Sequence, residues 1–492
     1  MKVNRVLNAL GIVLVAFGGI LLSPIIIALV EQEYSSVLPF ITASSVSVLV
    51  GLGFQKYGGF SRNFDELKRN EGLLIVTLSW VVTAAMGAIP YLFFELSPLD
   101  AYFESVSGIT TTGATILVDF SRYPKDFFFW RSLTQWLGGM GIIVLFVAIL
   151  PQFSVAGRQM FFAEAPGPTE EKMTPRIAQT AKALWMVYVL LTIAETGLLY
   201  ASDMPFFDAV CNALSTMAAG GFSPHPQSIM GYENPGVVWI ITLFMFLAGS
   251  NFALLYRVLI QGKPLVLVKS EEFRFYFIIV LVTSFFLFLV LMDKGKGLSA
   301  SLRDSIFQIV SIITTAGFSS ADFALWGITA QVLIFMVMLV GGCAGSAGGG
   351  VKVVRVLFGA KYLKREIMQI LHPQAVLPVK IDRKSIDEII SRQILGFLLF
   401  YFVLMTCSSL VVTVIEGDAG VGLVGTAATI GNIGPGFGEI GPMGTFGDLS
   451  PLTKIIFIFN MIAGRLELIP ILAMTHPDFW HFRFGRKGAD RQ

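Results

Sequence analysis

The chain has 492 residues, of which 54% are hydrophobic and only 14% are charged, and its mean hydropathy is +0.73. Soluble domains carry roughly 25% charged residues, so this composition excludes an ordinary soluble protein. The formal net charge of +2 gives no case for nucleic-acid binding, and the three well-separated cysteines lack the spacing of a disulfide framework or a metal site. The chain is therefore expected to be an integral membrane protein.

Uncharged runs long enough to cross the hydrocarbon core, about 18 residues or more, predict ten transmembrane helices. They are expected near residues 6–30, 34–55, 72–94, 132–150, 183–202, 236–256, 275–292, 325–351, 393–415 and 455–475. The first run follows Lys2 and Arg5, as a signal peptide would. Its length and the immediate second span favour a retained helix instead. The last eight spans form four pairs.

Each of these four pairs brackets a short amphipathic segment that ends in a glycine turn. The copies read DAYFESVSGITTTGAT, DAVCNALSTMAAGGFS, DSIFQIVSIITTAGFSS and, more diverged, AATIGNIGPGFGE. Without gaps, three sets of positions coincide: Asp100, Asp208 and Asp304; Ser107, Ser215, Ser311 and Ala428; Gly113, Gly221, Gly317 and Gly434. Segments of about 14 residues are too short to span the membrane, so they predict re-entrant half-helices. The acids are expected as caps or first-turn residues of these half-helices.

Glycine turns at membrane depth can build a cation site. Glycine reaches positive φ at little steric cost, so such a turn can direct successive carbonyl oxygens toward a common axis. A ring of carbonyls replaces part of an ion's hydration shell, and the C-terminal end of each half-helix adds partial negative charge. One turn alone would be explained as a helix C-cap. Four turns in register, roughly 100 residues apart, predict internal repeats that form four walls of one cation pore.

Positively charged loops predict the orientation. Lys and Arg gather after the second, fourth, sixth and eighth spans and in the C-terminal tail, whereas loops 201–235 and 416–450 have neither. The positive-inside rule then places both termini in the cytoplasm and the glycine turns on the outer side. Lys294, Lys296 and Arg303 are exceptions to this pattern.

The motifs SGITTTGAT, MAAGGFS, ITTAGFSS and GNIGPGFG resemble those of the Trk/Ktr/HKT superfamily, and most closely those of TrkH-type potassium transporter membrane subunits. The resemblance covers nearly the whole chain. It implies an all-α polytopic membrane protein with four pseudo-symmetric helix–pore loop–helix repeats around one pore, plus two N-terminal transmembrane helices. The implied units are residues 1–70, 71–180, 181–272, 273–390 with an intramembrane loop at 341–350, and 391–492.

The resemblance also implies a potassium filter made of backbone carbonyls. It places that filter at Thr110, Thr111, Thr112 and Gly113; at Ala218, Ala219, Gly220 and Gly221; at Thr314, Thr315, Ala316 and Gly317; and at Gly431, Asn432, Ile433 and Gly434. In plant relatives, a serine at the first glycine position accompanies sodium transport. Gly113 therefore favours potassium, with rubidium and caesium as surrogates. A weakly selective or sodium-preferring channel or symporter of the same superfamily is the alternative.

Two features follow the filter in the sequence. Residues 341–350 contain Gly341, Gly342, Gly345, Gly348, Gly349 and Gly350, and each interior glycine costs a helix roughly 1 kcal/mol relative to alanine. This stretch should unwind, although close helix packing through Gly-x-x-x-Gly is an alternative. Arg465 lies inside the last span and should face a cavity or a partner, with an ion pair to Glu195 as the simpler explanation. The resemblance implies that the loop and Arg465 form a gate.

The family implies partners as well. Trk-type subunits work as homodimers on a cytosolic nucleotide-binding regulatory subunit (TrkA-type), so both are expected here, in the bacterial inner membrane. Potassium is the expected cargo, and the chain itself has no nucleotide motif that predicts an organic cofactor. No catalytic Ser–His, paired-Asp or metal-spaced cluster appears at membrane depth, so an enzyme is not expected. The sequence does not distinguish a channel from proton- or sodium-coupled transport.

Overall fold

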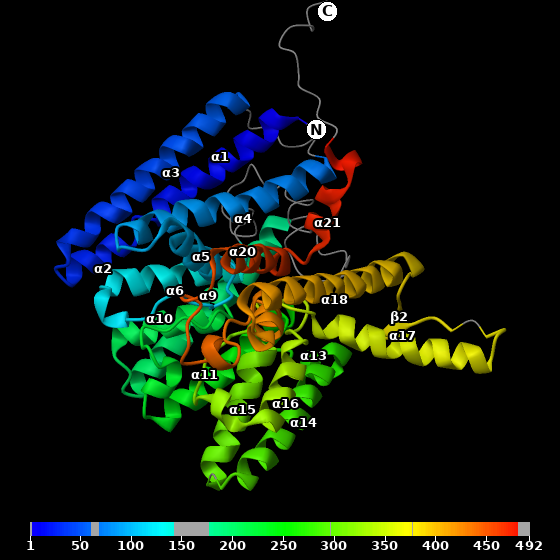
Figure 1. Ribbon diagram of the computed structural model, residues 1–492. Coiled ribbons are helices and arrows are strands. Elements are labelled where there is room, and N and C mark those ends of the chain that lie inside the picture. Colours follow the sequence, from blue (N-terminus) through cyan, green and yellow to red (C-terminus); the bar gives the residue numbers. More distant parts are fainter. Residues whose placement is uncertain (1, 61–67, 142–176, 296, 376, 481–492) are drawn as a thin grey trace, which may run out of the picture.

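The computed structural model describes residues 2–60, 68–141, 177–295, 297–375 and 377–480. It is almost wholly helical (Figure 1). Its α-helices are α1 Val3–Ile20, α2 Pro24–Val30, α3 Val37–Gly58, α4 Arg69–Leu92, α5 Pro98–Ile109, α6 Lys125–Gly139, α9 Ile177–Ala201, α10 Phe206–Met217, α11 Pro235–Ala248, α12 Phe252–Leu259, α13 Leu265–Lys269, α14 Glu271–Asp293, α15 Leu298–Ile313, α16 Ile328–Met338, α17 Val353–Leu371, α18 Glu388–Glu416, α19 Thr426–Ile430, α20 Pro451–Arg465 and α21 Ile469–Thr475.

Short helical turns and one small hairpin complete the described chain. The turns are η1 Tyr34–Ser36, η2 Phe120–Arg122, η3 Ser228–Gly231, η4 Phe323–Trp326, the π-helical η5 Val421–Gly425, η6 Gly438–Ile440 and η7 Pro477–Trp480. The antiparallel strands β1 Lys380–Ile381 and β2 Lys384–Ser385 pair Lys380 with Ser385. In Figure 1 this hairpin, α17 and the start of α18 form an arm that extends from the body at the right.

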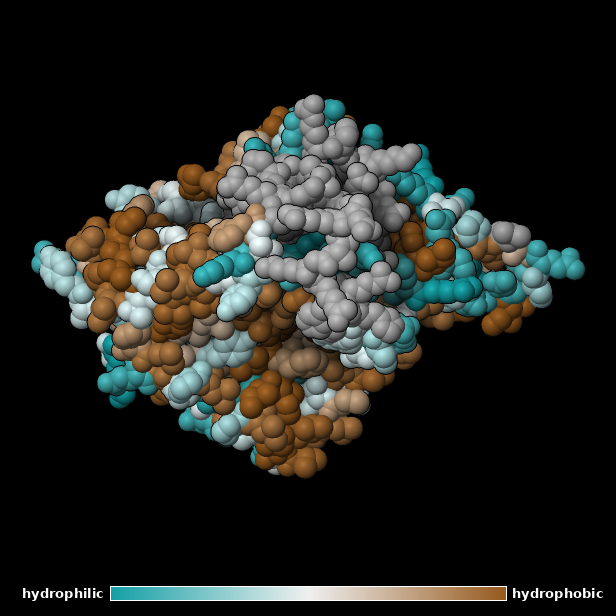
Figure 2. All heavy atoms as spheres, turned by 90° about the horizontal axis from the view of Figure 1, so that it is seen from above, coloured by the Kyte–Doolittle hydropathy of each residue, from teal (hydrophilic) through white to brown (hydrophobic). Residues whose placement is uncertain are grey.

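Six apolar helical stretches of the described chain are long enough to cross a membrane. They are Val3–Val30, Tyr34–Gly58, Asn70–Leu92, Gln179–Ala201, Glu271–Asp293 and Glu388–Glu416. A seventh candidate is α11 followed by α12, a pair bent by 110°. Figure 2 shows apolar side chains over much of the body and polar side chains on the arm at the right. The predicted fold class, an all-α polytopic membrane protein, is confirmed.

The two N-terminal helices α1 and α3 pack through small residues. A Cβ atom placed on Gly11 would lie 2.5 Å from the carbonyl oxygen of Gly51, so the two backbones are in direct contact. Ser47 donates a hydrogen bond across the same interface to the carbonyl of Leu14 at 2.8 Å. Small residues that allow such close approach are typical of helix pairs in membranes.

Four units of two helices and an intervening half-helix follow the N-terminal pair. They are α4–α5–α6, α9–α10–α11, α14–α15–α16 and α18–α19–α20, in which η5 continues directly into α19. The second long helix of one unit packs on the half-helix of the next: α6 on α10, and α11 on α15. The third and fourth units meet where Gly317 packs on Ile433, and α20 of the fourth unit packs on α5 of the first, so the four units close into a ring.

The second helices of the last three units are interrupted, so the prediction of continuous spans is wrong for 236–256 and 455–475, whereas the unwinding expected at residues 341–350 is observed. Predicted spans 236–256, 325–351 and 455–475 break after Ala248, Met338 and Arg465 respectively. The predicted span 132–150 begins as α6, which starts at Lys125 and ends at Gly139, and its residues 142–150 lie outside the described residues.

Glycines at the breaks explain this difference. A Cβ on Gly138 would lie 1.8 Å from the carbonyl oxygen of Ile109, and one on Gly464 would lie 2.0 Å from that of Ile430. In the second unit, a Cβ on Gly249 would lie 2.5 Å from a methyl carbon of Thr314. The second helices therefore press directly on the chain next to the glycine turns, and the same glycines weaken the helix at that level.

The contact between Gly11 and Gly51 yields a stability prediction. Gly51→Ala should lower the stability of the protein by about 1–3 kcal/mol, because the new Cβ has no room against the facing backbone. Gly53→Ala, two residues further along α3, is the matched control: its Cβ meets no atom within 4 Å, and alanine should favour the helix. Thermal unfolding of the full chain in detergent measures both variants. A Gly51→Ala protein as stable as Gly53→Ala would contradict the packing.

Candidate functional site

The four glycine turns share one backbone conformation. The first residue of each turn is right-handed, from Thr110 with φ −81° and ψ 2° to Gly431 with φ −79° and ψ −11°. The second and fourth residues have positive φ: Thr111 (56°), Ala219 (55°), Thr315 (60°) and Asn432 (53°), then Gly113 (80°), Gly221 (78°), Gly317 (75°) and Gly434 (97°). Non-glycine residues rarely adopt positive φ, and such positions cluster at functional sites.

The backbone N–H groups of each turn are directed back toward its half-helix. The third residue donates to the aligned serine or alanine carbonyl: Thr112 to Ser107 at 2.8 Å, Gly220 to Ser215 at 2.9 Å, Ala316 to Ser311 at 2.8 Å and Ile433 to Ala428 at 2.8 Å. The second residue also donates to its half-helix, as Thr111 does to Gly108 at 2.9 Å. In a trans peptide the carbonyl points opposite to the N–H, so the carbonyls of the first and second residues point away from the half-helices.

Each glycine packs against a carbonyl oxygen of the next turn, and the series closes. A Cβ on Gly113 would lie 2.2 Å from the oxygen of Gly220. A Cβ on Gly221 would lie 2.1 Å from the carbonyl oxygen of Ala316, and one on Gly317 would lie 2.1 Å from that of Ile433. A Cβ on Gly434 would lie 2.6 Å from the carbonyl oxygen of Thr112. The structure therefore brings all sixteen predicted filter residues together in one closed ring, in the register expected from the sequence.

A cavity that is open to solvent lies over this ring. Its walls include Gly113, Gly221, Gly317 and Gly434, one from each turn. Thr115, Arg131 and Ser319 are among the polar residues that line it. The ring is thus reached from one side through a vestibule.

The aligned acids occupy unequal positions. Asp100 lies in the first turn of α5 and pairs with Lys454 of α20 at 2.6 Å, which links the first and fourth units. Asp208 lies in the first turn of α10 and accepts a hydrogen bond from Tyr232 at 2.9 Å. For Asp304 the prediction is wrong: α15 begins earlier, at Leu298, so this buried acid lies inside the helix, next to Arg303.

The glycine-rich segment after α16 is not helical and lies against the ring from the side opposite the vestibule. A Cβ on Gly348 would lie 2.6 Å from the carbonyl oxygen of Thr314, and one on Gly349 would lie 2.7 Å from that of Gly431. The Gly349 N–H donates to the Thr315 hydroxyl at 2.7 Å. Since the segment between Met338 and Val353 has no helix, Gly-x-x-x-Gly packing of a continuous helix does not describe it.

Arg465 connects this segment to the first unit. Its guanidinium donates to the carbonyl of Ala347 at 2.7 Å and to that of Gly139 at 2.8 Å. Neither carboxylate oxygen of Glu195 has a hydrogen-bond partner among the described residues, so Arg465 does not hydrogen-bond to this acid. Glu467 lies beyond the end of α20 with φ 56° and pairs with Arg355 of α17.

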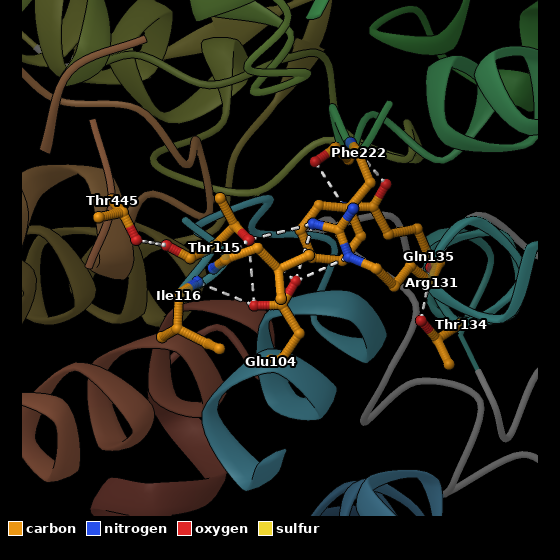
Figure 3. Close-up of polar contacts among 10 residues, drawn as sticks. Glu104, Thr115, Ile116, Arg131, Thr134, Gln135, Phe222 and Thr445 are labelled. Atoms are coloured by element: carbon orange, nitrogen blue, oxygen red, sulfur yellow. Dashed lines mark hydrogen bonds and ion pairs between the residues drawn. The ribbon is translucent and has the colours of Figure 1, made fainter. Parts of the chain in front are cut away.

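A buried ion pair beside the ring was not anticipated from the sequence. The guanidinium of Arg131 in α6 lies 2.8 Å from the carboxylate of Glu104 in α5, and both side chains are almost fully buried. The same carboxylate accepts the N–H of Ile116 at 3.0 Å and the hydroxyl of Thr115 at 3.1 Å (Figure 3). Charged residues inside apolar segments are a signal of function in membrane proteins, and this signal could have found both side chains.

The ion pair holds the chain that follows the first glycine turn. The carbonyl of Thr115 accepts the N–H of Phe446 at 2.9 Å and the hydroxyl of Thr445 at 3.2 Å. The guanidinium carbon of Arg131 lies 3.9 Å from the ring centre of Phe222, just after the second turn. One buried cluster therefore contacts the first, second and fourth units.

The chain is similar to known proteins over nearly its whole length. A family model of TrkH cation transport proteins matches residues 50–480. The Trk system potassium uptake protein TrkH of Salmonella typhimurium is 38% identical, over 98% of this chain and 100% of that protein. TrkI of Halomonas elongata, also named a Trk system potassium uptake protein, is 32% identical over 97% and 96%. The crystal structure of the potassium transporter TrkH from Vibrio parahaemolyticus has a TM-score of 0.88, with 35% identity over 98% of this chain and all of that one.

The buried ion pair between Arg131 and Glu104 predicts how much the stability changes when either charge is removed. Arg131→Met should destabilise the protein by about 3–5 kcal/mol, because it leaves the Glu104 carboxylate buried and without its charged partner. Adding Glu104→Gln should recover part of this loss, since the second change removes the unpaired charge. Thermal unfolding of the single and double variants in detergent measures the coupling. Losses that simply add would contradict the pairing.

Proposed function

The chain belongs to the TrkH family of cation transport proteins, and on that basis we propose that it takes up potassium ions across the bacterial inner membrane through the ring of glycine turns. The closed packing of each glycine on the neighbouring carbonyl carries this proposal. It defines one axis surrounded by four equivalent backbones, which is the arrangement that a cation without its water shell requires.

The ring is proposed to select potassium with backbone oxygens. Carbonyls of the first and second residues of each turn point away from their half-helices, and the C-terminal ends of these half-helices lie at the ring. Aligned peptide dipoles at those ends add partial negative charge, which favours a cation and repels an anion. Potassium is the cargo, and glycine at all four fourth positions supports it over sodium. The sixteen residues of the four turns form the proposed filter.

The glycine-rich loop and Arg465 are proposed to form the gate. Gly348 and Gly349 lie against filter carbonyls of the third and fourth turns, where they obstruct an ion leaving the ring. The Arg465 guanidinium holds the loop through Ala347 and places a positive charge beside the same path. Conduction then requires the loop to move away and the charge to be screened or displaced.

The proposed pore also gives an orientation in the membrane, a division into units and an assembly. Both termini are proposed to be cytoplasmic, with the vestibule outside and the arm of α17, β1 and β2 inside. The pore units are residues 71–180, 181–272, 273–390 and 391–492, after the N-terminal pair in residues 1–70. A homodimer on a nucleotide-binding regulatory subunit of the TrkA type is the proposed assembly. The relatives' name, Trk system, supports a multicomponent transporter.

Gly221→Ala tests the filter. Its Cβ would lie 2.1 Å from the Ala316 oxygen at a positive φ, so the ring must open. Uptake of ⁸⁶Rb⁺ into proteoliposomes should fall on the order of tenfold or more. Gly197→Ala is the control, because its Cβ meets no atom within 4 Å, and it should transport as wild type. Full uptake by a correctly folded Gly221→Ala protein would refute the filter.

Arg465→Ala tests the gate. A unit charge about 10 Å from an ion raises the ion's energy by about 1.7 kcal/mol at an effective dielectric constant of about 20, so ⁸⁶Rb⁺ flux should rise on the order of tenfold. Loss of the bond to Ala347 should act in the same direction by releasing the loop. Arg257→Ala, at an exposed site on α12, is the charge-matched control. Equal or lower flux with normal expression would count against the gate.

A further inference from the structure

A single buried amide joins the first two walls of the ring. The side chain of Gln135 in α6 is fully buried. Its Nε2 atom donates to the carbonyl oxygen of Gly220 at 2.6 Å, and its Oε1 atom accepts the N–H of Phe222 at 3.0 Å (Figure 3). The carbonyl of Gly220 is also the one against which Gly113 packs. Gln135 therefore bonds both neighbours of Gly221 at the corner between the first and second turns.

Gln135 is itself held in place by its surroundings. Arg131 lies four residues earlier, on the same face of α6, and its guanidinium lies over the Phe222 ring while it pairs with Glu104. A Cβ on Gly220 would lie 2.5 Å from the amide carbon of Gln135, so the amide fits directly against the turn. The acceptor oxygen of Gly220 and the donor N–H of Phe222 set the orientation of the amide, with its N–H groups toward the carbonyl.

The other three units do not supply an equivalent bond of this kind. Gly138 and Gly464 make the same contact with the residue before their turns, and aligning the second helices on Gly138, Ala248, Gly341 and Gly464 places Met245, Met338 and Met461 where the first unit has Gln135. All four side chains are buried. A thioether cannot donate a hydrogen bond. The backbone of the ring therefore repeats four times, whereas the side chains of the second helices that contact it differ between units.

We infer that Gln135 is a specificity-determining residue, whose amide tunes the second wall of the ring for potassium against sodium. The inference rests on the proposed function. The Gly220 carbonyl belongs to the third residue of its turn and packs against Gly113, so its bond to Gln135 ties the second wall to the first. The two bonds also fix the position of the second wall, so the ring cannot contract around a smaller ion. Selection by cavity size therefore favours the larger ion, potassium.

The test is competition for ⁸⁶Rb⁺ bound to the purified full-length chain, because equilibrium binding does not depend on the gate. K⁺ and Na⁺ are titrated as competitors, and the ratio of their half-inhibiting concentrations is compared between proteins. Gln135→Met installs the residue that the other three units carry. Gln135→Asn retains an amide but shortens the side chain by one methylene. Met245→Leu is the control at the equivalent position.

Either Gln135 variant that folds should show a preference for K⁺ over Na⁺ about three- to tenfold below wild type, the size expected for one hydrogen bond. Met245→Leu should keep the wild-type ratio. A selective wild type whose ratio is unchanged in the Gln135 variants would overturn this inference alone. A wild-type ratio near one would overturn the proposed potassium selectivity, and with it the role of Gln135. A change in stability without a change in ratio would reduce Gln135 to a packing residue.

Discussion

The close approach of each turn glycine to a carbonyl of the next turn is the constraint on which the rest of the structure depends. There is no space for a Cβ at any of the four contacts, from Gly113 on Gly220 around to Gly434 on Thr112. Four chain segments spread over more than three hundred residues must therefore meet in one plane. The half-helices make this possible because their last carbonyls accept the N–H groups of the turns, which leaves the turn carbonyls free to face the axis.

The same constraint shapes the helices around the ring. The second helix of each unit must come close to the chain beside a turn, so glycines such as Gly138 and Gly464 stand at the contact, and the helices end there. Beyond the ends of these helices, the four units have different structures. The third uses its break for the glycine-rich loop, and the fourth ends its helix at Arg465, which bonds to that loop. The glycine contacts therefore make the four turns alike, and because the second helices end at these contacts, the segments that follow them can differ between units.

Much of the ring could be predicted from the sequence, because glycine positions, half-helix length and register are local properties. The alignment of Ser107, Ser215, Ser311 and Ala428 found the residues whose carbonyls accept the turn N–H groups. Contacts between units were harder to predict. The breaks at Ala248 and Arg465 depend on what lies beside each helix, and hydropathy does not report that. Asp304 aligned with two first-turn acids, yet α15 extends beyond it. The contacts of Gln135 and Arg131 with the second glycine turn could not be predicted from the sequence, because that turn belongs to the next unit.

The most direct measurement is a structure of the protein grown in rubidium, with anomalous scattering used to locate the ion. If the four turns form a potassium filter, Rb⁺ lies on the ring axis, coordinated by carbonyl oxygens from all four turns and absent when Gly221 is replaced by alanine. Rb⁺ bound only elsewhere, or an empty axis at saturating rubidium, would contradict the filter.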